Sequence, residues 1–309
     1  MKKLFIIGNG FDLAHSIPTK YDDFHEFLKE NYNDDDDFDF TIPSSQVSAD
    51  GEEVFDLDDV AKFLRTAISQ TEGDNWNDLE HTLGVMDYDH FLDDYSMYDD
   101  DDENPFHEVY RNEDKSSDFS GAMKLINTFF EEWIDTIDVT RASAKSSFEE
   151  LIEIDRDLFF TFNYTRTLQE LYNAEIVCHI HGNQGGKICF GHGNDKNYYE
   201  DYESSHIGSE SNLSELDRTL RKDTKKALYD KKIFFDKLND ITHIYSYGFS
   251  YSDVDLIYIK SIIERIDSQN TIWNLHQKDS GVNTISKLKE MEIILIRNGF
   301  KGEIKRFEV

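Results

Sequence analysis

Histidines in one short stretch of the chain have the type and spacing needed for proton chemistry. In VCHIHGNQGGKICFGHG, residues 177–193, His179 and His181 alternate along a predicted strand and so are expected to face the same side of it. Gly182 then breaks the strand. Because an imidazole has an unperturbed pKa of about 6.5, His181 is a candidate general base. His179 is expected to be a core histidine. A metal site with His192 as third ligand is the alternative, but no carboxylate lies at a suitable spacing.

An asparagine in a second stretch stands where a strand is predicted to end. In LFFTFNYTRTLQELY, residues 158–172, an apolar run ends at Thr161-Phe162, and a helical pattern follows Asn163. Polar side chains at the carboxyl ends of strands in an open α/β sheet point into the ligand crevice. Asn163 is therefore a candidate site residue, and the alternative is that it only caps the helix.

A glycine turn, Gly8-Asn9-Gly10, follows the first apolar run. The third glycine of a dinucleotide fingerprint is missing, since Leu13 stands at that position. Glycines still let a backbone approach phosphate closely, and the N–H groups of such a loop hold an anion without Lys or Arg. The alternative is a tight corner that needs glycine dihedrals.

A similar turn, Gly248-Phe249-Ser250, follows the apolar run 243–247. Ser252 or Asp253 then caps a predicted helix, and Asp255 lies inside its first turn. Helix capping and pairing with the helix dipole explain these polar residues without a ligand.

Composition excludes some classes of function. The 309 residues carry 32 Lys plus Arg against 64 Asp plus Glu, a net charge of -32, which argues against nucleic-acid binding. The acidic runs Asp34–Asp37 and Asp99–Asp102 are expected to be solvated loops. The only two cysteines, Cys178 and Cys189, are expected to be buried and reduced. No signal peptide and no apolar stretch near 20 residues is present, so we expect a soluble cytoplasmic protein without membrane contact.

Short apolar runs alternate with helical patterns, which is typical of a mostly parallel α/β sheet with helices on both faces. The expected strands are 3–7, 158–162, 176–180, 188–190, 243–247, 271–275 and 303–307. The expected helices around them are 21–31, 165–172, 213–238, 253–266 and 282–298. Residues 32–154 hold most acidic runs, no strand pattern, and helical patterns at 57–70, 76–86, 119–137 and 142–153. We therefore expect a discontinuous sheet domain, 1–31 plus 155–309, and an inserted acidic helical lobe, 32–154.

The order of these motifs resembles the sirtuin fold of NAD-consuming enzymes. Ser16-Ile17-Pro18-Thr19-Lys20-Tyr21 stands where sirtuins have Gly-Ile-Pro-Asp-Phe-Arg. Asn163 falls on the sirtuin catalytic Asn, His181-Gly182 on the catalytic His-Gly, and Gly248-Phe249-Ser250 on the Gly-Thr-Ser that contacts the nucleotide. The four-cysteine zinc module of sirtuin deacylases is absent, so the resemblance favours NAD cleavage over protein deacylation and implies no metal. Tyr21 in place of the sirtuin Arg leaves the details of the nucleotide pocket open.

A closer resemblance is to the bacterial AbiH family of abortive-infection proteins, which implies defence against phage by self-limiting growth. It rests on motifs along nearly the whole chain: Gly8 to Ala14, Trp76 with Leu79-Glu80, Thr161 to Thr165, His179 with His181-Gly182, Phe190 to Gly193, and Gly248 to Tyr258.

Together the resemblances imply a Rossmann-like, sirtuin-like sheet whose substrate is NAD. Asn163 would orient a water or ribose hydroxyl, and His181 would take a proton. The residues expected to contact the nucleotide are Gly8, Asn9, Gly10, Phe11 and Asp12 at the pyrophosphate, Thr19 and Tyr21 near the nicotinamide ribose, Gly248 and Ser250 near the adenosine, and also Pro18 and Asp255.

Two other functions stay open. The same crevice would bind a nucleotide signal such as an ADP-ribose derivative, without catalysis, if Asn163 and His181 are only ligands. A metal-dependent nuclease would use His179, His181, His192 and the acidic runs, which the charge disfavours. A phage-derived activator and a homo-oligomer also stay open. The helical lobe is expected to cover the crevice and to place Trp76 and Glu80 at its edge.

Overall fold

The computed structural model describes residues 2–32, 40–73, 76, 78–93, 105–278 and 281–309. The chain divides into two compact units. Unit 1 contains Met1–Thr19, Ile134–Cys189 and Asp223–Val309, and unit 2 contains Lys20–Trp133 and Phe190–Lys222. The acidic runs Asp34–Asp37 and Asp99–Asp102 lie outside the described residues.

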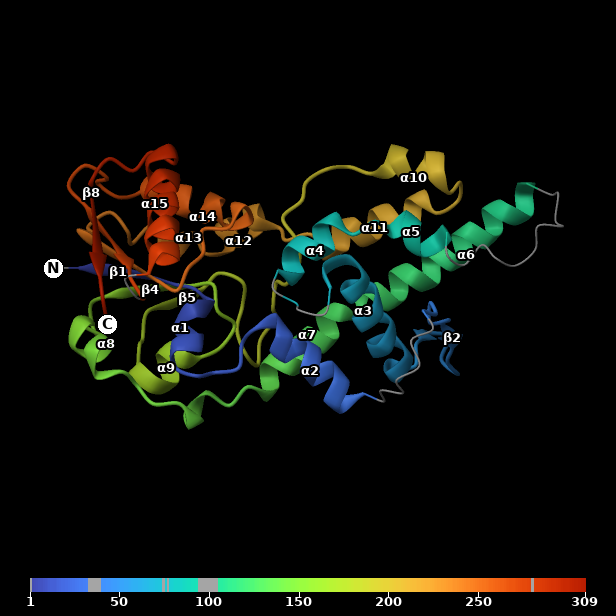
Figure 1. Cartoon of the computed structure of the whole chain (residues 1–309), viewed down its shortest axis with the longest axis horizontal. Coiled ribbons are helices and arrows are strands. Elements are labelled where there is room, and N and C mark those ends of the chain that lie inside the picture. The colour runs from blue at the N-terminus through green and yellow to red at the C-terminus, as the bar shows by residue number, and fades with distance from the viewer. Residues whose placement is uncertain (1, 33–39, 74–75, 77, 94–104, 279–280) are drawn as a thin grey trace. The chain divides into compact units, whose positions relative to one another are not determined.

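Unit 1 is built on a six-stranded, all-parallel sheet with the strand order β5-β4-β1-β6-β7-β8. Its strands are β1 (Lys3–Ile7), β4 (Leu158–Thr161), β5 (Val177–His179), β6 (His243–Tyr247), β7 (Ile272–His276) and β8 (Glu303–Phe307). The chain adds β4 and β5 on one side of β1, then returns to place β6 on the other side (Figure 1). This is the order of doubly wound dinucleotide-binding sheets, so the predicted Rossmann-like α/β class is confirmed.

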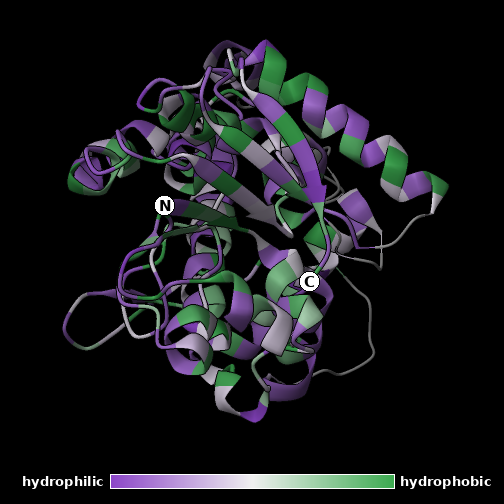
Figure 2. Cartoon of the chain, turned by 90° about the vertical axis from the view of Figure 1, so that its left-hand side faces the viewer, coloured by the Kyte–Doolittle hydropathy of each residue, from purple (hydrophilic) through white to green (hydrophobic). Residues whose placement is uncertain are grey.

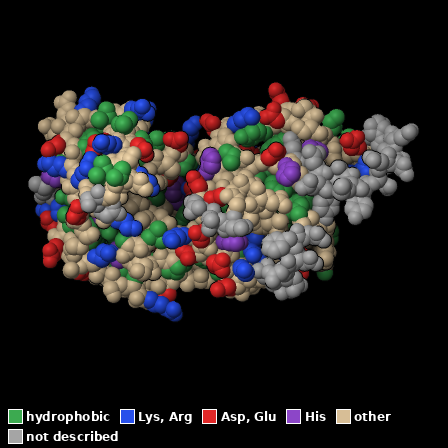
Figure 3. Space-filling model, viewed as in Figure 1, with side chains coloured by type: hydrophobic (Ala, Val, Ile, Leu, Met, Phe, Trp, Pro, Cys, Tyr) green, Lys and Arg blue, Asp and Glu red, His purple; other side chains and the backbone are tan. Residues whose placement is uncertain are grey.

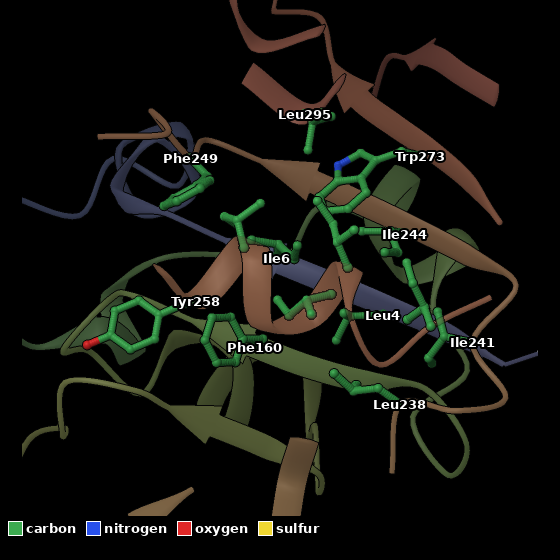
Figure 4. Packing of buried hydrophobic residues seen from close by; sticks show 14 of the residues in the cluster. Leu4, Ile6, Phe160, Leu238, Ile241, Ile244, Phe249, Tyr258, Trp273 and Leu295 are labelled. Carbon is green, nitrogen blue, oxygen red and sulfur yellow. The ribbon is translucent and has the colours of Figure 1, made fainter. Parts of the chain in front are cut away.

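Helices cover both faces of this sheet because its strands are apolar on both faces. The helices and short 3-10 turns of unit 1 are α1 (Asn9–Ala14), η1 (Val139–Arg141), α8 (Ser146–Leu151), α9 (Thr167–Tyr172), α12 (Thr224–Asp230), α13 (Lys232–Phe235), η2 (Asp253–Asp255), α14 (Leu256–Ile263) and α15 (Val282–Arg297) (Figure 1). Leu4 and Ile6 of β1 pack into a core cluster with α13, α14 and α15 (Figure 4). Phe5 and Ile7 pack into a second cluster with α1, α8 and α9.

Polar and apolar residues alternate on α15, as expected of a helix with one face on the sheet and the other in solvent (Figure 2, upper right). On the face of unit 1 drawn in Figure 3, acidic and basic side chains are interspersed. No helix within the described ranges is long and apolar enough to cross a membrane.

Unit 2 is mainly helical. It contains α2 (Tyr21–Asn31), α3 (Leu57–Glu72), α4 (Leu79–Val85), α5 (Tyr88–Asp93), α6 (Pro105–Lys124), α10 (Tyr199–Ser205), α11 (Glu210–Leu220) and a small antiparallel pair, β2 (Gln46–Val47) with β3 (Glu53–Val54). Helix α7 (Ile126–Thr136) runs across the boundary between the units. Asp56 caps α3 by accepting from the N–H groups of Asp58 and Asp59, and Gly73 ends it with φ 92°.

These units divide the chain at other residues than the predicted lobe 32–154 does. Helix α2 belongs to unit 2, because its buried Phe24 packs against Trp76 and Trp133. Helix α8 belongs to unit 1, because Phe148 packs against Phe5 under the sheet. The segment Phe190–Lys222, predicted in the sheet domain, belongs to unit 2.

Two predicted elements are wrong. Residues 188–190 form no strand; the N–H of Cys189 donates to the carbonyl of His181, but no ladder follows. The predicted helix 213–238 is divided into α11, α12 and α13. It is interrupted because Lys222 N–H donates to the carbonyl of His192 and because Asp223 caps α12.

Candidate active site at the carboxyl edge of the sheet

The candidate site of unit 1 is at the carboxyl edge of its sheet. The direction of strand addition reverses between β1 and β6, and ligands of doubly wound sheets bind outside the carboxyl ends of the strands at such a switch point. The segments that follow β1, β4, β5 and β6 contain the predicted site residues of this unit.

The two turns at the switch point pack closely against each other, and three glycines make this close approach possible. A Cβ on Gly8 would stand 2.6 Å from Gly248 O, and a Cβ on Gly10 would stand 2.7 Å from Gly248 Cα. Gly248 itself has φ +66°, and its own Cβ would stand 2.4 Å from the backbone nitrogen of Phe11. Packing between the β1 and β6 turns therefore accounts for all three glycines.

The same packing uses N–H groups that were expected to hold phosphate. Gly8 N–H donates to the carbonyl of Tyr247, Gly10 N–H to that of Gly248, and Phe11 N–H to that of Gly8. The Phe11 side chain is fully buried in the core, so it is a packing residue instead of a ligand contact. Any phosphate at this turn must be held by other groups.

Asn9 and Thr19 form a reciprocal pair beside this turn. The Asn9 amide donates to the Thr19 carbonyl at 2.8 Å, and the Thr19 hydroxyl donates to Asn9 Oδ1 at 2.6 Å. Pro18 and Ser250 are exposed. These polar and exposed groups border the glycine turns without entering the core.

A buried carboxyl group, Asp12, links the β1 segment to the β4 segment. It is 1% exposed, and Oδ2 accepts the Thr165 hydroxyl at 2.5 Å; Thr167 Oγ1 lies 3.0 Å from Thr165 Oγ1. Burial raises the pKa of Asp12 from 3.8 to about 6, although the neighbouring side chains of Thr165, Thr167 and Asn163 lower it. Oδ1 is buried and accepts no hydrogen bond from any described group. Sequence reasoning expected nucleotide contact here and missed this buried pairing.

Asn163 is held by its backbone, which leaves its side chain for other contacts. Its N–H donates to Thr161 Oγ1, and its carbonyl accepts from His179 Nδ1 at 2.9 Å. Its side-chain Nδ2 is buried and donates to no described group. Asn163 lies before α9, whose first residue is Thr167, and Arg166 occupies the capping position. The alternative interpretation of Asn163 as a helix cap is therefore wrong.

His179 is a neutral structural histidine. Nδ1–H donates to Asn163, so Nε2 accepts from the Gln169 amide at 2.8 Å. Burial lowers the pKa of His179 to about 4, although the bond to Asn163 raises it. Both ring nitrogens are engaged, which confirms the expectation of a satisfied core histidine and disfavours a metal ligand at this position.

His181 and Asp255 form a buried pair. His181 Nε2 lies 3.3 Å from Asp255 Oδ1, and Ser252 donates to Asp255 Oδ2 at 2.9 Å. The His181 ring packs edge-on against Tyr258 at 5.5 Å, and Tyr258 turns its hydroxyl away from the hydrophobic cluster (Figure 4). Asp255, expected at the nucleotide, is thus placed to orient the histidine.

The expectation that His179 and His181 face the same side is wrong. Strand β5 ends at His179, so strict alternation does not extend to His181. Gly182, with φ +84°, turns the chain, and a Cβ there would stand 2.0 Å from the Lys187 carbonyl oxygen. His179 consequently contacts Gln169 of α9, whereas His181 contacts Tyr258 of α14.

Other predicted residues belong to unit 2 and have partners there. Tyr21 packs against Phe130 and Phe190. Trp76 is 1% exposed and stacks on His25 at 4.6 Å, so it cannot stand at the edge of an open site. Glu80 pairs with Lys222, whose Nζ lies 2.7 Å from both carboxylate oxygens, so it is not a solvated residue.

His192, the third histidine of the alternative metal site, is a structural residue of unit 2. Nε2–H donates to the Asp217 carbonyl at 3.0 Å, and Nδ1 accepts from the N–H of Asn194. Burial lowers its pKa, although Asp217 raises it. Across the described ranges, no group of three or more His, Cys, Asp and Glu side chains is arranged to hold a metal ion.

Neither Cys178 nor Cys189 belongs to a disulfide. Cys178 is buried, and burial raises its pKa to about 12, as expected of an unreactive core thiol. Cys189 is only partly buried, so the prediction that both are buried is wrong for this residue.

Comparison with known families gives one match over most of the chain. The model of the family described as "Bacteriophage abortive infection AbiH" matches residues 4–276. That range includes the segments after β1, β4, β5 and β6 that form the candidate site. No curated protein matches the sequence significantly.

Proposed function

The chain belongs to the AbiH family of bacteriophage abortive infection, and we propose that it acts in this role by cleaving NAD at the bond between nicotinamide and ribose. The observation that carries the proposal is the placement of Asn163 and His181. Thr161 and His179 are register partners on β4 and β5, and Asn163 and His181 each follow two residues later. A buried amide and a buried histidine thus occupy matching positions at the carboxyl edge of a dinucleotide-type sheet.

The chemistry of these groups suits this reaction. Breaking the nicotinamide–ribose bond develops positive charge on the sugar, as in glycoside hydrolysis. Asn163 orients a water or a ribose hydroxyl. His181 takes a proton, and Asp255 holds its ring and stabilises the imidazolium that forms. Because Nε2 faces Asp255, the proton is transferred through Nδ1.

The surroundings of the site support the same assignment. The carboxyl groups of Asp12 and Asp255 are both buried at this edge, and a nearby negative charge favours an oxocarbenium-like transition state. The aromatic rings of Phe162, Tyr164 and Tyr258 lie around His181, at 5.8, 6.4 and 5.5 Å, and lower the local dielectric. The negative groups in this setting act on the cationic nicotinamide end of NAD more strongly than they would in water.

Nicotinamide release tests the proposal. The purified protein is incubated with NAD, before and after addition of a phage lysate, and free nicotinamide is quantified by chromatography. Asn163→Ala and His181→Ala are expected to lower the rate by about 10²–10⁴-fold, the usual loss when a positioned acid or base is removed. The matched control is His243→Ala, because His243 is a partly exposed histidine at the amino end of β6, the opposite edge of the same sheet. This control is expected to keep the wild-type rate.

Growth arrest distinguishes the enzyme from a nucleotide-binding module. The Asn163 and His181 variants should no longer arrest growth when expressed at high level, because NAD depletion is the proposed toxic event. If His181→Ala keeps full toxicity while cellular NAD stays constant in both strains, the chain is not an NAD-cleaving effector. A module that binds a nucleotide signal then explains the same residues as ligands.

A further inference from the structure

Two polar atoms at the candidate site have hydrogen-bonding capacity that the described protein groups do not use. Asp12 Oδ1 is an acceptor, and Asn163 Nδ2 is a donor. Both residues are more than nine-tenths buried, with exposed fractions of 1% and 8%. Buried polar groups of native proteins are nearly always satisfied, so such a pair calls for an explanation.

The two atoms belong to neighbouring side chains. The Asn163 side chain lies close enough to Asp12 to lower its pKa, and Thr165 joins the two segments through its bond to Asp12 Oδ2. An oxygen that carries a hydrogen can satisfy both atoms at once, because it accepts from Nδ2–H and donates to Oδ1. Water and a ribose hydroxyl are the groups of this kind in the proposed reaction.

We propose that Asp12 and Asn163 together hold the water that attacks C1′ of the nicotinamide ribose, and that Asp12 Oδ1 accepts its proton. The inference rests on the proposed function and assigns the water to this pair. The oxygen of the water forms a bond to C1′ as the bond from C1′ to the nicotinamide nitrogen breaks. The electron pair of that bond leaves with nicotinamide, which becomes neutral. The proton moves to the Asp12 carboxylate and then to solvent, so the products are nicotinamide, ADP-ribose and a proton.

The environment of Asp12 matches this task. A general base is most effective when its pKa lies near the working pH, and burial moves this carboxyl group in that direction. The side chains that face it are Thr165 and Thr167 from the segment after β4, and Asn163 beside them, all uncharged. The nearby titratable group that directly follows its helix, His15, is bound instead to Phe11 O and to the Tyr172 hydroxyl.

His181 contacts Asp255 and Tyr258 and is left to take a proton from a ribose hydroxyl as the bond to nicotinamide breaks, and to return it to the same oxygen afterwards, so that one net proton is released. The inference therefore gives two bases to one reaction, each with its own set of neighbours. Removal of either base is expected to slow the reaction for a different reason, because Asp12 acts on the attacking water and His181 acts on the ribose.

The kinetic test uses Asp12→Asn and Thr165→Val in the full chain. Asp12→Asn removes the base and is expected to lower kcat by about 10²–10⁴-fold with KM for NAD unchanged. The matched control is Asp157→Asn, because Asp157 is also fully buried in unit 1 but stands just before β4, at the opposite edge of the sheet. It should keep the wild-type kcat.

Thr165→Val gives a readout that a structural role would not change. The Thr165 hydroxyl lowers the pKa of Asp12, so its loss should raise that pKa and move the acidic limb of kcat/KM to higher pH. At pH values above this acidic limb, the rate should stay within a few-fold of wild type, since the carboxylate of Asp12 remains.

Each outcome is decisive. If wild type cleaves NAD and Asp12→Asn cleaves it equally fast, or if Thr165→Val leaves the acidic limb in place, Asp12 is not the base, and the proposed function still stands. If wild type releases no nicotinamide in the presence of phage lysate, the proposed function fails, and this inference fails with it.

Discussion

Replacing Asp12 by Asn is predicted to stabilise unit 1 while it removes the proposed NAD-cleaving activity. The carboxyl group is 1% exposed, and burial raises its pKa from 3.8 to about 6. Each unit of pKa corresponds to about 1.4 kcal/mol, so the ionised group costs the folded state about 3 kcal/mol above pH 6. Asn has nearly the same shape and no charge, and its amide oxygen keeps the hydrogen bond from Thr165.

The effect has a definite dependence on pH. Below the unfolded pKa, 3.8, the carboxyl group of Asp12 is neutral in both states and costs nothing. Between about 4 and 6 the unfolded chain loses its proton first, so the folded state binds more protons, and stability falls as pH rises. The difference between Asp12→Asn and wild type should therefore grow from about 0.5 kcal/mol at pH 4 to about 3 kcal/mol at pH 8 in favour of the variant.

Hydrogen exchange followed by mass spectrometry measures this difference in the right part of the chain. The amides of β1 and β6 report the opening of unit 1, and the free energy of opening is compared between variant and wild type at each pH. Taking the difference removes contributions of other acidic groups that are common to both proteins. A difference that stays within about 0.5 kcal/mol across the pH range would show that Asp12 is not desolvated.

Asp157→Asn is the matched control, and it is expected to lower the stability of unit 1 where Asp12→Asn raises it. Asp157 accepts the N–H groups of Lys3 and Glu153 and lies 3.7 Å from the Lys3 ammonium. Hydrogen bonds to a charged group contribute about 1.5–3 kcal/mol, so this substitution should lower the stability of unit 1 at pH 7. The same chemical change would thus stabilise one end of the sheet and destabilise the other.

Two further predictions concern packing. Gly10→Ala should destabilise unit 1 by about 1–3 kcal/mol, because the new methyl group would stand 2.7 Å from Gly248 Cα; an unchanged urea midpoint would contradict the close packing of the two turns. Lys222→Met should destabilise unit 2 by about 3–5 kcal/mol, because it removes the cation that faces the mostly buried Glu80. Lys225→Met, at an exposed lysine that follows three residues later and belongs to unit 1, is its control, and equal hydrogen exchange of unit 2 in the two variants would refute the role of the buried pair.

The sequence predicts the longer strands of the sheet well, but it does not show which short apolar runs form strands. β1, β6 and β8 have the expected bounds, because five-residue runs beside turn residues leave few alternatives. The run 188–190 has the same apolar character, but it forms no strand, although Ile188 and Phe190 are buried and Cys189 is partly buried. Three apolar residues do not distinguish a strand from a buried loop. The break within 213–238 had a local signal, since Asp223-Thr224 is a typical helix start.

The sequence predicted only part of the candidate site, because the contacts that define the chemistry of the site join residues far apart in the chain. Asn163 and His181 stand just past strand ends, and the general rule for open sheets identifies such positions. The contacts that define their chemistry are long-range: Asp12 meets Thr165 153 residues away, and His181 meets Asp255 74 residues away. For the glycines of the first turn, the sequence pattern predicted a ligand contact that the structure does not need in order to explain them. Their pattern indicates phosphate, but contact with Gly248, far along the chain, already accounts for them.

Asp12 differs from the other buried aspartates of the described residues in the groups that surround its carboxylate. A carboxylate taken out of water is ordinarily stabilised by a cationic or basic neighbour, and removal of that neighbour is costly. The side chains that shift the pKa of Asp12 carry hydroxyl and amide groups, and none of these side chains is a cation. A destabilising arrangement of this kind persists where activity requires it, as in other sites that combine desolvation with a perturbed pKa. The other buried aspartates in the described residues each face a basic group: Asp157 faces Lys3, Asp217 faces Arg221, and Asp255 faces His181.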